Sequence, residues 1–440
     1  MDWITQAAQL ILSLSILVIL HELGHFIPAR LFGTRVEKFY LFFDPWFSLY
    51  KYKKNDTEYG IGWLPLGGYV KIAGMIDESM DREQMKLPAQ EWEFRAKPAW
   101  QRLIIMIGGV SVNAVLGIAI YIMIAFVWGN QYIPNDQLTY GIYCDSLGKS
   151  IGLENGDRIV SIDNRRIEKF TDIRLDLVIN QPGSIQIDRN GSTLNLAIPS
   201  GFTAEVIKSE NVTFIEPAII AEIYEVAAGS PAEEAGLLKG DRIVKLNQDS
   251  VPFFQDVVHF LRSHRDQEVT VGVVRSGQMF YTNSMVTEQG TLGFQVTPPG
   301  EQIQMKVETY DAFTAIPAGY KKGIDAFSNY IKQMKLIFNP ETKAYESLGG
   351  FVMIAKAFSP EWDWERFWNF TAFLSIILAI MNLLPIPALD GGHVMFLLYE
   401  IVSRRKPHEK VLEYAQMAGM ILLLGLLLYA NGNDIVKLFK

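Results

Sequence analysis

Apolar residues gather in four segments of this chain, at residues 3–20, 103–128, 367–384 and 411–430. A helix of about 20 mostly apolar residues spans the hydrocarbon core of a bilayer. The pattern therefore predicts four transmembrane helices. The polar stretch between the second and third segments is long enough to fold in water.

The segment between the first two spans is predicted to form strands rather than helix. Runs at 36–40, 46–52, 59–63 and 66–71 alternate aromatic residues with glycines and basic residues. Aromatic residues favour strands and also favour the boundary between membrane and water. We expect a β-loop that lies at the membrane interface, with an ordinary surface loop as the alternative.

The long polar stretch contains a repeat. The sequence Gly-Asp-Arg-Ile-Val occupies residues 156–160 and again 240–244, and a β-type run, a turn and a helical stretch follow each copy. Two copies at this spacing predict tandem domains rather than a solenoid, which needs shorter and more numerous units. The segment 230–241 resembles the helix and strand entry of bacterial PDZ domains, and the first copy resembles it more loosely.

A linker is predicted after the repeat, and it contains an amphipathic helix. Residues 320–338 place apolar side chains at helical spacing opposite a set of lysines. Such a helix either lies on the membrane surface or provides a docking face for the soluble domains.

Composition and charge narrow the range of partners. The net charge of −8, without a basic stripe, argues against nucleic acid as a partner. Cys144 is the single cysteine, so the chain forms no intramolecular disulfide and cysteine cannot dominate a metal site. Membrane lipid is the expected partner of the apolar segments.

Basic residues orient the predicted spans. They cluster in the loop after the first span, before the second span, and at 404–408 between the last two spans. By the positive-inside rule these three segments are cytoplasmic. Both termini and the repeat then lie outside, which in a bacterium with an inner and an outer membrane means the periplasm.

The first span runs directly into His21-Glu22-Leu23-Gly24-His25. Residues four positions apart share one face of a helix, so the two imidazoles can converge on one cation, and Glu22 can reach a metal-bound water. The alternative is a pair of buried, hydrogen-bonded histidines with a paired glutamate. Three ionisable groups beside a membrane span are costly to keep without a function.

A catalytic zinc usually takes three protein ligands, so a third is expected from another span. The third apolar segment runs in the same direction as the first and leads into Asp390, which therefore reaches the same depth as the histidines. Spacing alone leaves His393 open as a ligand. The alternative role for Asp390 is to cap the N-terminus of the next helix.

Two prolines interrupt the chain just before Asp390. Pro385 and Pro387 prevent a regular helix and leave an extended stretch with unpaired carbonyls. Such backbone is tolerated inside a membrane where it lines a cavity or meets another chain, so we expect it to hold a substrate strand, with Asn382 donating to the substrate. A simple proline kink is the alternative.

The HELGH sequence, the repeat and residues 382–393 together resemble the bacterial site-2 proteases of the regulator-of-sigma-E type, over nearly the whole chain. The resemblance implies an α+β multi-pass membrane protein with four transmembrane helices, a membrane-associated β-loop and two tandem periplasmic PDZ domains. Two motifs depart from the family: Gly-Val-Ser-Val-Asn stands at 109–113 where Gly-Pro-x-x-Asn is frequent, and Gly-Gly-Phe at 349–351 replaces Ser-Gly-Pro.

The expected boundaries are 1–26, 101–128, 366–403 and 411–432 for the spans, 27–100 for the β-loop, 129–215 and 216–300 for the PDZ-like domains, and 301–365 for the linker and amphipathic helix. The resemblance also implies roles for individual residues: His21, His25 and Asp390 as zinc ligands, Glu22 as general base, and Asn382, Pro385 and Pro387 as substrate-binding residues. His393 then either supports the zinc ligands or is structural.

The expected activity is zinc-dependent cleavage of single-span membrane proteins in the bacterial inner membrane. By resemblance, the substrates are anti-sigma factors already cut once outside the cytoplasm, in regulated intramembrane proteolysis, and also remnant signal peptides. Two other classes stay open: a PDZ-bearing membrane scaffold without catalytic activity, and an ion or proton pathway built from the intramembrane His, Glu and Asp residues.

Overall fold

The computed structural model describes residues 2–75, 88–209 and 213–439. It divides into two compact units, each described here by itself. The first comprises Met1–Gly129, Thr309–Ile331 and Leu348–Lys440, and the second comprises Asn130–Glu308 and Lys332–Ser347.

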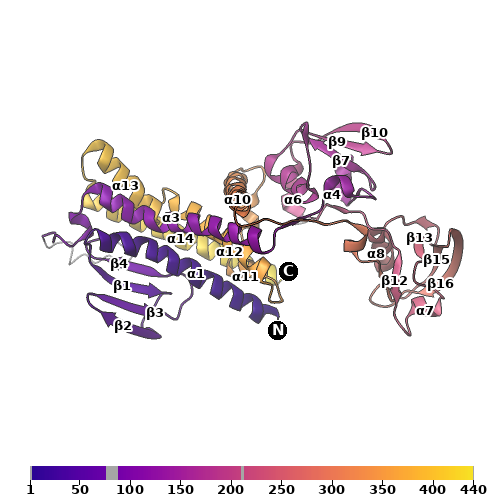
Figure 1. Cartoon of the computed structure of the whole chain (residues 1–440), viewed down its shortest axis with the longest axis horizontal. Helices are drawn as coiled ribbons and strands as arrows, with labels where there is room; N and C mark the ends of the chain where they lie inside the picture. Colours follow the sequence, from indigo (N-terminus) through magenta and orange to yellow (C-terminus); the bar gives the residue numbers. More distant parts are fainter. Residues whose placement is uncertain (1, 76–87, 210–212, 440) are drawn as a thin grey trace. The chain divides into compact units, whose positions relative to one another are not determined.

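The first unit contains four long apolar helices (Figure 1), and they confirm the four predicted spans. They are α1 (Asp2–Leu31), α3 (Ala99–Val127), α12 (Trp364–Leu383) and α14 (Glu409–Leu438). Helix α3 packs against both α1 and α12. Because α1 continues well beyond residue 20, the HELGH sequence lies inside the same helix as the first apolar segment.

Glycines allow α1 and α3 to touch backbone to backbone. A Cβ atom at Gly24 would lie 2.5 Å from the carbonyl oxygen of Gly108, and one at Gly108 would lie 2.0 Å from the carbonyl oxygen of Gly24. Small residues permit such close approach between membrane helices, where packing drives association. The contact holds the HELGH segment directly against α3.

The region 366–403, predicted to contain the third span and the proline break before Asp390, forms two helices. Helix α12 ends at Leu383, and a separate helix, α13 (Asp390–Ser403), follows the prolines. The prolines end the helix as expected, but the intervening segment is a set of turns rather than an extended strand. Ile386 N–H donates to the Leu384 carbonyl, and Ala388 has a φ of 81°.

The predicted β-loop is a four-stranded sheet whose strands lie in the order β2-β3-β1-β4. The strands are β1 (Val36–Leu41), β2 (Tyr50–Lys54), β3 (Thr57–Ile61) and β4 (Tyr69–Ile72). Val36 and Ile72 are buried in one apolar cluster with Ala29 at the end of α1 and Met106 of α3. Among the described strands, β4 pairs only with β1, so it forms an edge of the sheet.

The predicted amphipathic helix is α10 (Ala315–Ile337), and one of its faces packs on α3. A Cβ atom at Gly319 would lie 2.4 Å from the Ile122 backbone, and one at Gly323 would lie 2.9 Å from the Ile118 side chain. Lys322 lies over the Tyr121 ring and donates to Asn369 of α12. This end of α10 is therefore anchored on the helices of the first unit. A shorter helix, α11 (Phe351–Lys356), packs on α1.

The second unit contains two small domains with the same sheet topology, as the sequence repeat predicts. The first has the strand order β10-β9-β7-β8 and the second has the corresponding order β16-β15-β13-β14. The first sheet comprises β7 (Arg158–Ile162), β8 (Arg165–Arg166), β9 (Ser184–Arg189) and β10 (Ser192–Ala197). The second comprises β13 (Arg242–Leu246), β14 (Asp249–Ser250), β15 (Glu268–Arg275) and β16 (Gln278–Met285).

Helices and short strand pairs complete the two domains. The first has α4 (Ser146–Ser150), α5 (Phe170–Leu175), α6 (Phe202–Ser209), and β6 (Ile142–Cys144) paired with β11 (Ile215–Pro217). The second has α7 (Pro231–Glu234), α8 (Phe254–Ser263), and β12 (Ile223–Val226) paired with β17 (Phe294–Val296). Each domain has its own apolar core.

The chain returns to the first small domain after completing the second. Strand β18 (Lys306–Glu308) pairs with β5 (Asn130–Tyr132), and Ile303 is buried in the first domain's core. The predicted linker therefore does not begin at residue 301. Its first residues belong to the unit that contains the repeat, because Ile303 packs in the first domain's core and β18 pairs with β5 there.

The structure explains why the repeat preserves an aspartate. Asp241 is buried, and it accepts hydrogen bonds from Nε and Nη2 of Arg275 at 2.7 and 2.6 Å and from Leu238 N–H. Asp157 makes the equivalent contacts with Arg189. Burial alone would raise the pKa of Asp241, but the hydrogen bonds outweigh it, and the pKa lies below its usual value. The ionised carboxylate therefore stabilises the domain at neutral pH and ceases to do so in strong acid, as the pH falls through the folded-state pKa.

We expect Arg275→Met to loosen the second small domain alone. The substitution leaves the buried Asp241 carboxylate without its positively charged partner, which is strongly unfavourable. Hydrogen exchange of the full chain in detergent should rise about tenfold or more in residues 223–296. Residues 142–197 serve as the internal control, because Asp157 keeps Arg189. A uniform rise in both domains, or none, would contradict this assignment.

Candidate active site and metal centre

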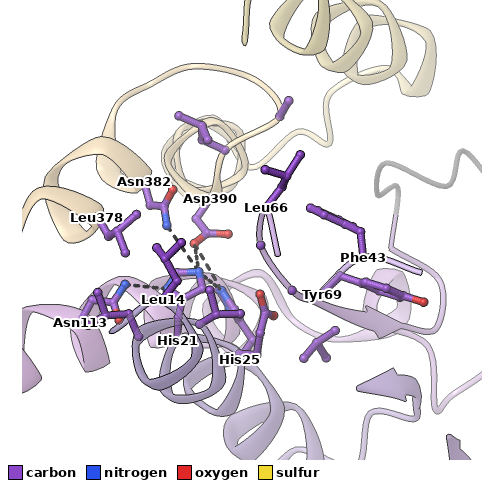
Figure 2. A pocket seen from close by; sticks show the side chains of 18 of the residues that line it. Leu14, His21, His25, Phe43, Leu66, Tyr69, Asn113, Leu378, Asn382 and Asp390 are labelled. Atoms are coloured by element: carbon purple, nitrogen blue, oxygen red, sulfur yellow. Dashed lines mark hydrogen bonds and ion pairs between the residues drawn. The ribbon is translucent and has the colours of Figure 1, made fainter. Parts of the chain in front are cut away.

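Three potential metal ligands from distant parts of the sequence converge in the first unit (Figure 2). Nε2 of His21 and Nε2 of His25 lie 3.3 Å apart, and each lies 3.3 Å from Oδ2 of Asp390. The histidines project from α1, and Asp390 is the first residue of α13. Among the described residues, this is the group of His, Cys, Asp and Glu side chains whose ligand atoms lie close enough to hold one metal ion.

The chemistry of the three donors fits zinc. Oδ2 of Asp390 is buried and has no hydrogen-bond partner, although both Nε2 atoms face it. Zinc accepts imidazole nitrogen and carboxylate oxygen, and three protein ligands leave one position open for water or substrate. The arrangement therefore matches a catalytic rather than a fully enclosed structural zinc site.

His25 is held by the backbone of α3. Its Nδ1 lies 2.8 Å from the carbonyl oxygen of Ile105. A carbonyl only accepts, so Nδ1 carries the proton and Nε2 keeps its lone pair directed toward Asp390. The sequence left two roles open for His25, a metal ligand or a buried, hydrogen-bonded histidine. The structure is compatible with both at once, because one ring nitrogen is hydrogen-bonded and the other is available as a ligand.

Gly109 is the first residue of the Gly-Val-Ser-Val-Asn sequence at 109–113, but the sequence does not reveal its role at the site. A Cβ atom there would lie 2.3 Å from Nε2 of His25 and 2.7 Å from Cε1 of His21. Only glycine leaves room for both imidazoles beside α3. No local pattern signals this requirement, since the contact joins two helices.

We expect Gly109→Ala to weaken zinc binding by about 10–100-fold, the range seen when support of metal ligands is disturbed. The added methyl group would displace both imidazoles. Zinc content of the purified protein after dialysis against a chelator measures the effect. Gly425→Ala is the matched control in α14, because nothing lies within 4 Å of a Cβ atom at that position. Equal zinc retention in both variants would show that the imidazoles do not need this space.

The cluster opens into a cavity of about 800 Å³. Glu22 and Asn382 line it beside the three clustered side chains, and much of the remaining wall is apolar. Figure 2 shows Phe43, Leu66 and Tyr69 on the side of the cavity opposite Asn382 and Leu378. Residues 66–72, which include the edge strand β4, form this side.

The residues predicted to bind substrate lie in different places. Nδ2 of Asn382 lies 3.5 Å from Nε2 of His21, so this amide points toward the metal ligands. Pro385 and Pro387 are not among the residues that line the cavity. Pro387 instead contacts α14, where a Cβ atom at Gly419 would lie 1.6 Å from the Pro387 carbonyl oxygen. The two prolines thus shape the turn that delivers Asp390.

The structure also separates the alternatives left open around Asp390. Leu389 precedes α13 as its N-cap residue, so the side chain of Asp390 does not cap the helix. His393 lines the same cavity but does not belong to the cluster of three ligand atoms. The geometry therefore favours Asp390 over His393 as the third ligand.

Comparisons with known proteins identify the family of this chain. The sequence profile of peptidase family M50 matches residues 9–426. The regulator of sigma E protease of Haemophilus influenzae is 26% identical over 459 residues, covering 100% of both chains. Protease RseP of Yersinia pestis is 29% identical over 460 residues, covering 98% of each chain. The regulator of sigma-E protease RseP of Salmonella typhimurium is 28% identical over 459 residues, again covering 98% of each chain.

The profile spans the HELGH sequence, both small domains and Asp390, and the structure brings the two ends of that match together at one potential zinc site. Four helices of this chain are long and apolar enough to cross a membrane. The chain therefore belongs to peptidase family M50, and it is a multi-pass membrane zinc metalloprotease.

Proposed function

We propose that His21, His25 and Asp390 bind the catalytic zinc and that Glu22 is the general base. The observation that carries the proposal is the convergence of three ligand atoms, from two helices far apart in sequence, at the wall of a cavity inside the helical unit. Glu22 follows His21 directly on α1 and lines the same cavity.

Zinc in this position supplies Lewis-acid activation of water and of the scissile carbonyl. Glu22 takes the proton of the attacking water and passes it to the leaving amine, so that one carboxylate serves both proton transfers. The amide nitrogen of Asn382 points toward Nε2 of His21. From there it donates a hydrogen bond to the oxygen of the reacting carbonyl. The apolar wall limits access of bulk water and strengthens these charge interactions.

The substrate class follows from the surroundings of the site. A cavity lined by membrane-spanning helices and largely apolar side chains suits another transmembrane segment as its occupant. Strand β4 lies at an edge of its sheet and lines the cavity, so an unwound substrate can add to it as a further strand. An unwound backbone is required, because a helix shields its peptide bonds from attack. We therefore propose single-span membrane proteins as substrates.

The relatives named for control of sigma E support anti-sigma factors as the substrates, after a first extracytoplasmic cut, and remnant signal peptides as a second group. The two small domains share one sheet topology, which supports a tandem repeat of PDZ-like domains, and basic residues cluster in the loops predicted to be cytoplasmic. We place the protein in a bacterial inner membrane with these domains in the periplasm, where they admit trimmed substrates.

Two reporters that share one transmembrane segment test this function. One carries a folded periplasmic domain, and the other ends a few residues outside the membrane. We expect the purified protein in liposomes to cleave the short reporter at least about tenfold faster, because only that reporter passes the two small domains. Equal cleavage of both would remove the size filter from the proposal, and cleavage of neither would remove the proteolytic function and favour the scaffold.

Thiol labelling tests the proposed orientation. The native Cys144 is buried, and burial raises the pKa of its thiol to about 11, so we expect it to stay unmodified in the folded protein. Cysteines introduced at the exposed positions Lys54 and Gln248 should react with an impermeant maleimide from opposite sides of the membrane. Labelling of both from one side would contradict the orientation.

A further inference from the structure

Asn113 of α3 is a fully buried polar residue beside the metal site, and catalysis as described above does not use it. Its Nδ2 lies 3.2 Å from Nδ1 of His21, which is the ring nitrogen that faces away from Asp390 (Figure 2). Its backbone carbonyl accepts a hydrogen bond from Ser375 of α12 at 2.7 Å. Asn113 is therefore fixed between three helices, with its side chain directed at a proposed zinc ligand.

The orientation of this amide decides which nitrogen of His21 carries the proton. With the NH₂ group toward the ring, Nδ1 must accept, and the proton then sits on Nε2. A protonated Nε2 has no lone pair for a metal. With the amide turned by half a rotation, Oδ1 accepts from Nδ1–H and the lone pair of Nε2 is free.

Hydrogen-bond counting does not choose between these orientations. Oδ1 of Asn113 is buried without a partner in the structure, and turning the amide would place the NH₂ group in that position instead. The orientation with Oδ1 toward the ring follows from the need for a free lone pair on Nε2, because Nε2 is the atom of His21 that faces His25 and Asp390. Coordination through Nε2 needs a proton on Nδ1, and that proton needs an acceptor.

The neighbouring histidine shows the same arrangement with a backbone group. The Ile105 carbonyl, also on α3, accepts from Nδ1 of His25 and leaves its Nε2 free. Helix α3 thus presents one acceptor to each imidazole. Such partners of the second ring nitrogen fix the tautomer and the ring orientation of metal-binding histidines.

We propose that Asn113 is a positioning residue, whose amide oxygen accepts a hydrogen bond from Nδ1–H of His21 and so holds His21 in the tautomer that binds zinc through Nε2. The inference rests on the proposed role of His21 as a ligand. If Asn113 acted only by packing, it would not matter whether its replacement accepts a hydrogen bond. If it acts as proposed, any acceptor at this position should support zinc binding, whether neutral or charged.

Zinc affinity of the full chain in detergent tests the proposal, by competition with a chromogenic chelator. We expect Asn113→Leu, similar in size but without an acceptor, to bind zinc about 10–100-fold more weakly. Asn113→Asp, which offers only acceptors, should bind within about threefold of the wild type or more tightly. Asn369→Leu, which removes an amide from α12 beside Lys322, is the matched control and should leave the affinity unchanged.

Each outcome decides the question. Unchanged affinity in Asn113→Leu would overturn the proposal, and so would a loss in Asn113→Asp as large as in Asn113→Leu, because the donor would then be the group that matters. If Asn113→Leu does not fold, Asn113→Asp decides alone: retention of zinc supports the proposal, and a loss of about tenfold or more overturns it. Absence of zinc binding by the wild type would instead refute the proposed metal site itself.

Discussion

Glu22→Gln is expected to abolish cleavage of a transmembrane reporter while the protein keeps its zinc. Glutamine is nearly the same size as glutamate but cannot take a proton from water at neutral pH. Loss of a general base typically costs about 10²–10⁴-fold in rate. Cleavage rate and zinc content are measured on the same preparation, so that loss of the base is separated from loss of the metal.

A neighbouring substitution controls for disturbance of α1. Ser15→Ala changes a polar side chain of the same helix whose hydroxyl donates to the Ile11 carbonyl, and it should leave cleavage unchanged. Full activity in Glu22→Gln would assign the proton transfer to another group. Loss of zinc together with activity would mean that Glu22 supports the metal rather than the attacking water.

Asp390→Asn is expected to remove both zinc and activity. The substitution replaces a charged ligand by a neutral amide, at a position where both Nε2 atoms lie 3.3 Å from the carboxylate oxygen. Loss of a direct ligand should exceed the roughly 10–100-fold loss of affinity that follows when only a supporting residue is removed. Zinc affinity by chelator competition and cleavage of the reporter are the two readouts.

Asp434→Asn is the matched control for that substitution. Asp434 is a buried aspartate of α14 that accepts hydrogen bonds from Val352 and Met353 N–H, in a different part of the first unit. We expect its replacement to leave zinc affinity unchanged. Retention of zinc in Asp390→Asn would return His393 to consideration as the third ligand.

The parts of the fold that sequence predicted depend on local patterns. Hydropathy located four membrane helices, and alternation of aromatic residues and glycines located the strands between the first two. The repeat at 156–160 and 240–244 predicted two small domains, which share a sheet topology. Periodicity is a property of each element alone, so no knowledge of the neighbouring elements was needed.

The site was predictable to a similar extent and for a similar reason. His21 and His25 are related by helical spacing, and the depth of Asp390 follows from the direction of its span. The structure places the three side chains together. The turn before Asp390 was only partly predicted: the prolines end α12, but contacts with α14 at Gly419 and Gln416 fold the segment compactly instead of extending it.

Residues whose roles arise between elements were not predictable. Gly109 matters because two imidazoles of another helix occupy the space next to it. Arg275 matters because β15 brings it to the buried carboxylate of the repeat. Strand β18 pairs with β5, although the whole of the second small domain lies between them in the sequence. Each depends on a contact that only the folded chain defines.

The central claim is that this zinc site cuts a peptide bond inside a membrane. Mass spectrometry of the products from a single-span reporter, incubated in liposomes with the wild-type protein, tests it most directly. We predict new termini within the apolar segment of the reporter, and their absence with Glu22→Gln or after zinc removal. Termini found only in the soluble flanks of the reporter, or the same termini with Glu22→Gln, would contradict the account.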